Sequence, residues 1–304
     1  MAAIIATQGL TKNYGASRGI TTLTFSVEEG EVFGFLGPNG AGKTTTIRTL
    51  MGLLRPNAGT ARIAGLDCWQ QSVAVKRLVG YLPSEFALDP TLTGAQILTY
   101  LGNLRGGVDP SVIKQLANRL DLDLSKRFRA YSHGNKQKIG LAQAFMHRPR
   151  LLILDEPTNG LDPLNQQEFY RMVAEVKAEG RTVFLSSHIL PEVEQTCDRV
   201  GIIREGQLVK VDAVSGLRDL QHHTVELTFP QPASAAWFSG LPGVRDATAD
   251  GQTVRLTVQG DLGAVLQAAA QHGATNLTTH EPSLEEIFLR YYAPQSASAA
   301  AAAR

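Results

Sequence analysis

The chain has 304 residues, enough for one large domain and a smaller second one. It carries 29 lysines and arginines against 28 aspartates and glutamates, so its formal charge of +1 excludes a global attraction to nucleic acid or anionic lipid. No apolar run approaches the roughly 18 residues of a membrane-spanning helix, the first residues lack a secretory signal pattern, and two distant cysteines, Cys68 and Cys197, favour a reduced cytoplasmic protein.

The first segments predict a small β layer. Residues 4–7 and 22–27 have the composition and alternation of strands, and a turn at residues 12–15 lies between them. This turn contains Tyr14, an aromatic side chain that precedes a glycine-rich segment. The surroundings of Tyr14 leave two interpretations open, stacking on the base of a nucleotide or packing on its own hairpin.

The glycine-rich segment at residues 37–44 fits G-x-x-x-x-G-K-[ST] at every fixed position. A buried strand is expected before it, at residues 31–36, and helical spacing follows at residues 45–51. Glycines let backbone N–H groups approach a polyanion, and the positive end of the helix adds to that attraction. This context favours a phosphate-binding loop over a turn that only joins a strand to a helix. The residues expected to bind a nucleotide here are Gly37, Pro38, Asn39, Gly40, Ala41, Gly42, Lys43, Thr44 and Thr45.

Two side chains of this loop have separate expected tasks. Lys43 is expected to reach the β- and γ-phosphates, and the Thr44 hydroxyl is expected to ligate Mg²⁺. Residues 53–83 then predict short strands, turns and one helix, and residues 91–130 show helical apolar spacing. We therefore expect a helical insertion between the phosphate loop and the later motifs.

Ser132 stands at the position of an N-cap, ahead of apolar residues at helical spacing. The free N–H groups of such a helix end can bind an anion. An ordinary capped helix needs no ligand, so this segment alone leaves both interpretations open.

Two later apolar runs end in polar residues, as buried parallel strands do at the sheet edge that carries ligands. Asp155 and Glu156 follow the first run, and His188 follows the second. In a phosphate-loop fold we expect Asp155 to hold Mg²⁺ and Glu156 to orient or deprotonate water. We expect His188 to contact the γ-phosphate, in preference to a purely structural role.

Beyond Ser215 the composition changes. Residues 225–279 predict the order strand, helix, strand, strand, helix, strand, which is that of a ferredoxin-like α+β domain. A last helix with a serine cap is expected at residues 282–289. The expected organisation is a nucleotide-binding domain at 1–215 with a helical subdomain at about 84–148, an accessory domain at 216–293, and a disordered alanine-rich tail at 294–304.

Residues 4–212 resemble the nucleotide-binding subunit of an ATP-binding-cassette (ABC) transporter, because five motifs occur in that family's order. The implied fold is an α/β P-loop NTPase cassette with a β layer, a mixed core sheet and a helical insertion. The separate chain, the segment 282–288 and the small C-terminal domain are similar to ATPase subunits of bacterial drug and antibiotic exporters. The five motifs are the phosphate loop, the signature at 132–137, the strand ending in Asp155 and Glu156, the aspartate loop at 159–162, and the switch residue His188.

The resemblance implies roles for individual residues. It implies that ATP is the nucleotide, that Tyr14 stacks on the adenine, and that Ser132, Gly134 and Asp162 contact ATP. The residues implied to be catalytic are Lys43, Glu156 and His188, and Mg²⁺ is the implied metal.

The sequence departs from this family in two places. The glutamine that usually follows the strand near residue 82 and reaches the metal is replaced by Ser84 and Glu85, and either could take its position. In the signature, His133 replaces the first glycine and Asn135 the usual glutamine. The added imidazole is expected to point away from the phosphate.

The resemblance further implies a head-to-tail homodimer, in which the signature of each copy closes the ATP site of the other. A separate integral membrane permease would contact residues 84–130, and the ATPase would sit at the cytoplasmic face of the cell membrane without a nucleic-acid partner. Two other classes are alternatives: an ABC ATPase that acts on ribosomes or DNA, and a resistance protein that binds ATP or a drug without turnover. A second cassette or a long coiled coil would indicate the first class, and the intact pair Asp155 and Glu156 argues against the second.

Overall fold

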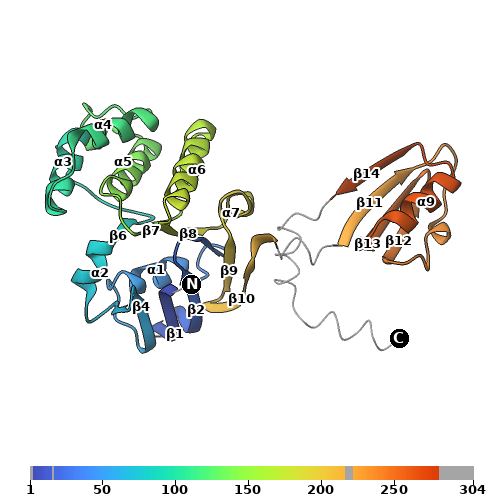
Figure 1. Ribbon diagram of the computed structural model, residues 1–304, viewed down its shortest axis with the longest axis horizontal. Helices are drawn as coiled ribbons and strands as arrows, with labels where there is room; N and C mark the ends of the chain where they lie inside the picture. The colour runs from blue at the N-terminus through green and yellow to red at the C-terminus, as the bar shows by residue number, and fades with distance from the viewer. Residues whose placement is uncertain (1–2, 16, 216–221, 281–304) are drawn as a thin grey trace. The chain divides into compact units, whose positions relative to one another are not determined.

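The computed structural model describes residues 3–15, 17–215 and 222–280. The chain divides into two compact units, Met1–Val214 and Ser215–Arg304 (Figure 1). Within the described ranges, no helix combines the length and the apolar character that a membrane crossing requires.

The first unit contains an antiparallel sheet in the order β2-β1-β4-β5. The strands expected at residues 4–7 and 22–27 are parts of a longer hairpin, whose antiparallel pairing extends from Ala3 opposite Glu28 to Tyr14 opposite Ser17. The four strands are β1 (Ala3–Tyr14), β2 (Ser17–Glu28), β4 (Ala58–Ile63) and β5 (Leu66–Asp67).

The second sheet of this unit has the order β10-β9-β3-β8-β7-β6. All of its strands run parallel except β10, which pairs antiparallel with β9. Its central strands are buried along their whole length and mostly apolar, because they are covered on both faces. The strands are β3 (Val32–Leu36), β6 (Val79–Leu82), β7 (Leu151–Asp155), β8 (Thr182–Ser187), β9 (Arg199–Arg204) and β10 (Gln207–Ala213).

A cluster of aromatic rings joins the two sheets. Phe25 of β2 stacks on Phe33 and Phe184 of the parallel sheet, with ring centroids 5.9 and 6.2 Å apart. These side chains are almost completely buried, and burial of each contributes roughly 1.5–3 kcal/mol to folding. The hairpin is thereby fixed against the strand that leads into the phosphate loop.

Helices surround the parallel sheet, and α1 packs against both sheets. The predicted helical insertion is present: α3 begins with a capping box of Thr93 and Gln96, and α4 begins behind Asp109 with a proline in its first turn. Figure 1 shows α3, α4 and α5 gathered on the side of the parallel sheet away from β1 and β4. The helices are α1 (Lys43–Leu50), α2 (Ser72–Leu78), α3 (Gly94–Leu104), α4 (Pro110–Arg119), α5 (His133–Phe145), α6 (Pro163–Ala178) and α7 (Leu190–Thr196), with a 3₁₀ turn at Phe128–Ala130.

The parallel strands place the predicted motifs at one edge. The phosphate loop follows β3, Glu156 follows β7 and His188 follows β8, and β8 lies between β3 and β7. Because parallel strands end at the same edge of their sheet, these segments meet there.

The second unit is an antiparallel sheet in the order β12-β13-β11-β14, with α9 packed against it, which is the ferredoxin-like order predicted from the sequence. The first of its two expected helices, at residues 233–240, is only a 3₁₀ turn at Ala235–Trp237, because Phe238 turns into the core and Gly240 follows with a positive φ of 86°. The expected helix at 282–289 and the tail at 294–304 lie outside the described residues. The other elements are β11 (His222–Thr228), β12 (Val244–Asp250), β13 (Thr253–Gln259), α9 (Gly263–Gln271) and β14 (Asn276–His280).

Candidate active site

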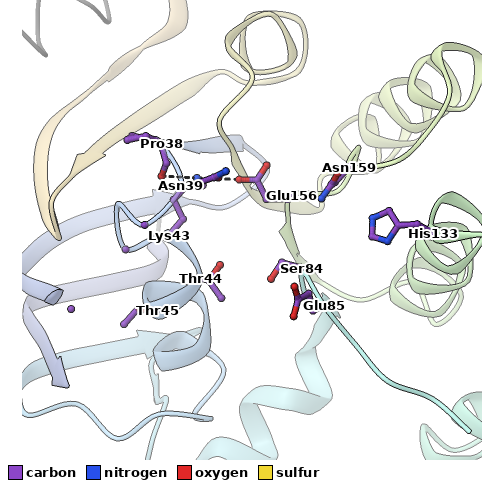
Figure 2. A pocket seen from close by; sticks show the side chains of 13 residues that line it. Pro38, Asn39, Lys43, Thr44, Thr45, Ser84, Glu85, His133, Glu156 and Asn159 are labelled. Atoms are coloured by element: carbon purple, nitrogen blue, oxygen red, sulfur yellow. Dashed lines mark hydrogen bonds and ion pairs between the residues drawn. The ribbon is translucent and has the colours of Figure 1, made fainter. Parts of the chain in front are cut away.

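A cavity of about 450 Å³ opens at the edge where the parallel strands end (Figure 2). Its walls come from the phosphate loop and the start of α1, from the segment after β6, from the loop after β7, and from the start of α5. Its lining residues are Gly19, Pro38, Asn39, Gly40, Gly42, Lys43, Thr44, Thr45, Ser84, Glu85, His133, Glu156 and Asn159.

The phosphate loop depends on glycine for its backbone shape. Gly42 has a φ of 111°, and a Cβ there would stand 2.8 Å from a methyl group of Ile20. A side chain would therefore be strained by conformation and by contact. The loop leads directly into α1, whose first N–H groups and helix dipole favour an anion.

Lys43, the first residue of α1, is almost fully buried, and its ammonium group lies over the loop. Its Nζ donates to the carbonyl oxygens of Gly37, at 2.6 Å, and Pro38, at 3.1 Å. The same atom lies 3.0 Å from Oε1 of Glu156, and Figure 2 shows the two side chains pointing toward each other. A cation held this way is in place to receive a phosphate oxygen.

Glu156 links this lysine to the predicted switch residue. Its other carboxylate oxygen lies 2.8 Å from Nδ1 of His188, so Lys43, Glu156 and His188 form a continuous chain of polar contacts. Glu156 also has a left-handed φ of 52°, a costly conformation for a side chain of this kind, and its N–H donates to the carbonyl oxygen of Ser186 at 3.2 Å. The backbone is held there by its surroundings, which fixes the carboxylate at the rim of the cavity.

Asp155 is completely buried beside this chain. Its Oδ1 accepts a hydrogen bond from the Ser186 hydroxyl at 2.5 Å, while its Oδ2 has no hydrogen-bond partner among the described residues. A buried carboxylate oxygen without a partner suits a hard cation such as Mg²⁺, as does the hydroxyl of Thr44. The residues at hand therefore fit the expected metal.

Ser84 and Glu85 both line the cavity, as Thr44 does, and Figure 2 shows all three side chains below Glu156. Ser84 is half-buried and Glu85 is exposed. Both oxygen-bearing side chains therefore remain candidates for the position that a glutamine has in related chains.

At the start of α5, the predicted N-cap is confirmed: the Ser132 hydroxyl accepts a hydrogen bond from the N–H of Asn135 at 3.3 Å. His133 packs on the loop after β7, since a Cβ on Gly160 would stand 2.4 Å from its ring, and Figure 2 shows the imidazole pointing toward Asn159. Ser132 stays exposed, so the added imidazole leaves this helix end open to an approaching group.

Several predicted site residues do not line the cavity. Tyr14 ends β1 with 42% of its surface exposed, and the ammonium group of Lys12 lies 5.6 Å from its ring centroid. Asp162 caps α6, and hydrogen bonds from Asn165 hold the pKa of its carboxyl below the usual value. The other residues of this group are Gly37, Ala41, Ser132, Gly134, Asp155 and His188, of which His188 reaches the site through Glu156.

The structure also shows supporting residues that sequence reasoning did not single out. Gln137 of α5 is buried, and its amide donates to the carbonyl oxygens of Glu156, at 3.1 Å, and Pro157, at 3.0 Å. Ser186 bonds both Asp155 and the backbone of Glu156. The signal for Ser186 was available, because it is a polar residue at the carboxyl end of a buried strand.

The fold and the phosphate loop define the class of protein: this is a P-loop nucleoside triphosphatase. The family model described as "ABC transporter" matches residues 20–159, and the model described as "ATP-binding protein DrrA1-3-like, C-terminal domain" matches residues 217–292. The chain belongs to the ATP-binding proteins of ABC transporters, and it is an ATPase that binds ATP.

Curated relatives match nearly the whole chain. The bacitracin transport ATP-binding protein BcrA of Enterococcus faecalis is 34% identical over 292 residues, which cover 94% of this chain and 95% of the relative. The linearmycin resistance ATP-binding protein LnrL of Bacillus subtilis (strain 168) is 32% identical over 302 residues, covering 94% of this chain and 97% of LnrL.

Solved structures match the cassette. A structure described as the ATP-binding subunit of an ABC transporter is 31% identical with a TM-score of 0.65, covering 71% of this chain and 92% of that one. The ATP-binding cassette MJ0796, described as a dimer bound to ADP and Pi, is 18% identical with a TM-score of 0.63, covering 69% of this chain and 98% of that one. The second likeness supports the fold alone.

Proposed function

We propose that this chain is the ATP-hydrolysing subunit of an exporter for antibiotics or drug-like amphipathic molecules, working with a separate permease at the cytoplasmic face of the membrane. Support comes from BcrA and LnrL, whose names refer to bacitracin transport and linearmycin resistance and whose similarity spans almost the whole chain, the C-terminal unit included. Neither relative supports an ABC ATPase that acts on ribosomes or DNA.

The observation that carries the catalytic part is the chain of contacts from Lys43 through Glu156 to His188. A γ-phosphate that reaches Lys43 would displace the Glu156 carboxylate from it, because both anions seek the same ammonium group. Glu156 would then be available to orient water for in-line attack, and His188 would hold the γ-phosphate. Lys43 would stabilise charge on the phosphoryl group as it transfers.

Mg²⁺ would be held by Thr44 and Asp155, with Ser84 or Glu85 nearby. When bound, the ion neutralises charge on the β- and γ-phosphates.

The assembly we propose is a head-to-tail homodimer. Ser132 and Gly134 stand at the N-terminus of α5 without lining the cavity of their own chain, and Ser132 is exposed. A helix N-terminus attracts anions, so this end would close on the triphosphate held by a second copy. Asp162 would lie in the same interface. Two complete sites would then form from two identical chains.

The permease contact is proposed on the segment 84–130. Its helix α3 exposes Tyr100 and Leu104, large apolar side chains with 60% and 66% of their surfaces accessible. Exposed apolar groups of this size suit contact with a partner protein.

The test is reconstitution of the chain with its co-purified permease in liposomes, followed by measurement of phosphate release with a panel of antibiotics. We expect one or more antibiotics of the panel, which includes bacitracin and linearmycin, to raise ATP turnover, and we expect Lys43→Ala to abolish both basal and stimulated turnover. If no antibiotic changes the rate of ATP hydrolysis while Lys43→Ala is inactive, the chain is still an ATPase but the exporter assignment is wrong.

A further inference from the structure

Glu192 is a buried carboxyl group for which the mechanism above has no role. It lies in the first turn of α7 and only 1% of its surface is exposed. Taking a carboxyl group out of water is unfavourable unless neighbouring groups bond to it. Its surroundings therefore indicate what it does.

The first neighbour is the turn that carries His188. The Ser187 hydroxyl, itself fully buried, donates a hydrogen bond to Oε2 of Glu192. The same hydroxyl oxygen accepts a hydrogen bond from the N–H of Ile189 at 2.9 Å. Ser187 and Ile189 are the residues on either side of His188, so the hydroxyl group that contacts Glu192 also bonds across the turn.

Thr158, a buried residue of the segment that follows Glu156, affects the same carboxyl group but gives it no hydrogen bond, because Oε1 of Glu192 is buried without a hydrogen-bond partner among the described residues. Burial raises the pKa of the Glu192 carboxyl to about 7, and the side chains of Ser187 and Thr158 act in the opposite direction. The hydrogen bond with Ser187 is therefore the contact through which Glu192 acts on the turn of His188, whose Nδ1 lies 2.8 Å from Glu156.

We propose that Glu192 is a positioning residue of the ATPase, which uses its hydrogen bond with Ser187 to hold the turn of His188 and so keeps His188 beside Glu156. This inference rests on the roles proposed for Glu156 and His188. A misplacement of about 1 Å in such a pair can cost up to about a hundredfold in rate. Binding of ATP by the phosphate loop needs no contact with Glu192, so affinity for ATP should be spared.

The test compares Glu192→Ala, Glu192→Gln and the control Glu194→Ala in the full-length chain, with phosphate release measured over a range of ATP concentrations. Glu192→Ala removes the hydrogen bond with Ser187, whereas the amide oxygen of Glu192→Gln can still accept it. We expect kcat to fall about tenfold or more in Glu192→Ala with KM for ATP within twofold of wild type. We expect Glu192→Gln to restore kcat to within about threefold of wild type. Glu194 lies on the same helix, half-buried, and its substitution should leave both constants unchanged.

An unchanged kcat in Glu192→Ala, an equal loss in Glu192→Gln, or a loss expressed in KM would overturn the inference. If Glu192→Ala does not fold, Ser187→Ala tests the same proposal, because it removes the hydroxyl group between Glu192 and the turn that carries His188. Wild-type kcat in that variant rejects the proposal, and a loss of about tenfold at unchanged KM supports it. Glu156→Gln in the same assay tests the proposed catalytic role of Glu156 separately from the positioning role of Glu192. If this variant hydrolyses ATP at the wild-type rate, the proposed catalytic roles are wrong, whatever the result for Glu192.

Discussion

The two halves of the proposed ATP site differ in how their own chain holds them. In the half at the strand ends, Lys43 and Glu156 are buried or nearly so and are joined by direct polar contacts to each other and to the neighbouring strand. In the half at the start of α5, Ser132 and His133 are exposed, and the hydroxyl of Ser132 serves only the cap of its helix. The difference fits two tasks: groups that react have to be fixed, and groups that close on a second copy have to be accessible.

The two halves nevertheless touch each other within one chain. Gln137 of α5 bonds the carbonyl oxygen of Glu156, and a Cβ on Gly134 would stand 2.4 Å from the carbonyl oxygen of Gly160. A rotation of α5 therefore has to move the backbone of the catalytic segment. In a head-to-tail dimer, this contact would connect the ATP that a chain closes to the ATP that it hydrolyses.

The largest expected effect comes from Glu156→Gln, which keeps the shape of the fixed half and removes its base. We expect kcat to fall about a hundredfold or more, since a lost general base typically costs that much. ATP should still bind and should trap a dimer that size-exclusion chromatography detects in the presence of Mg²⁺, whereas ADP should not. A variant that stays monomeric at saturating ATP contradicts the assignment of Ser132 and Gly134 to a second copy.

The exposed half is tested by Ser132→Asp in the Glu156→Gln background. Aspartate caps a helix as well as serine does, so α5 should keep its stability. Its charge would repel the γ-phosphate of the second copy, and we expect the ATP-dependent dimer to weaken by about tenfold or more, while the monomer binds ATP as before. Ser132→Asn is the matched control, because it caps the helix without a charge and should dimerise. If both variants dimerise equally, Ser132 does not lie close to the γ-phosphate of the ATP that the second copy holds.

The burial of the fixed half also predicts a pH dependence of stability. Burial raises the pKa of Glu192 to about 7, while its ordinary value is 4.5, so between these values the native state holds a proton that the unfolded state releases. Stability from this group is present at acid pH and falls as the pH rises through that window. The neighbouring charges that affect Glu192 are Glu156 and His188.

Glu192→Gln removes this titration. The free energy of unfolding of the variant should therefore rise relative to that of wild type by roughly 2 kcal/mol when the pH is raised from 5 to 8. Urea unfolding of both chains at the two pH values measures this difference, and Glu194→Gln serves as the control. A difference that stays constant would mean that the carboxyl group ionises as it does in water, and a difference that grows toward acid pH would mean that folding lowers its pKa.

Local sequence patterns predict some features of the fold and of the proposed ATP site but not others. The apolar runs that end at Asp155 and His188 predict parallel strands, and the phosphate loop carries its own pattern, so the fold and the nearby residues follow from local signals. The contact of Glu156 with Lys43 depends on which strands are neighbours, which no local pattern encodes. Gln137 and Glu192 were missed for a related reason, because a buried polar residue in a helix resembles a solvated one until its partners are known. The 3₁₀ turn at Ala235–Trp237 was expected as a helix, since eight residues give too few turns to distinguish them.

The smallest expected effect concerns Tyr14, which lies outside the cavity with its ring half-exposed beside Lys12. If it stacks on the base, Tyr14→Ala should weaken ATP binding by about tenfold, because stacking on an aromatic side chain contributes roughly 1–3 kcal/mol. GTP should weaken equally, since every base presents a similar face, and Tyr14→Phe should bind both nucleotides like wild type. Titration of the nucleotide-dependent change in tryptophan fluorescence measures the affinities of wild type and both variants for ATP and GTP. A loss confined to one base would indicate hydrogen bonding to its edge, and no loss at all would leave Tyr14 as a residue of its own hairpin.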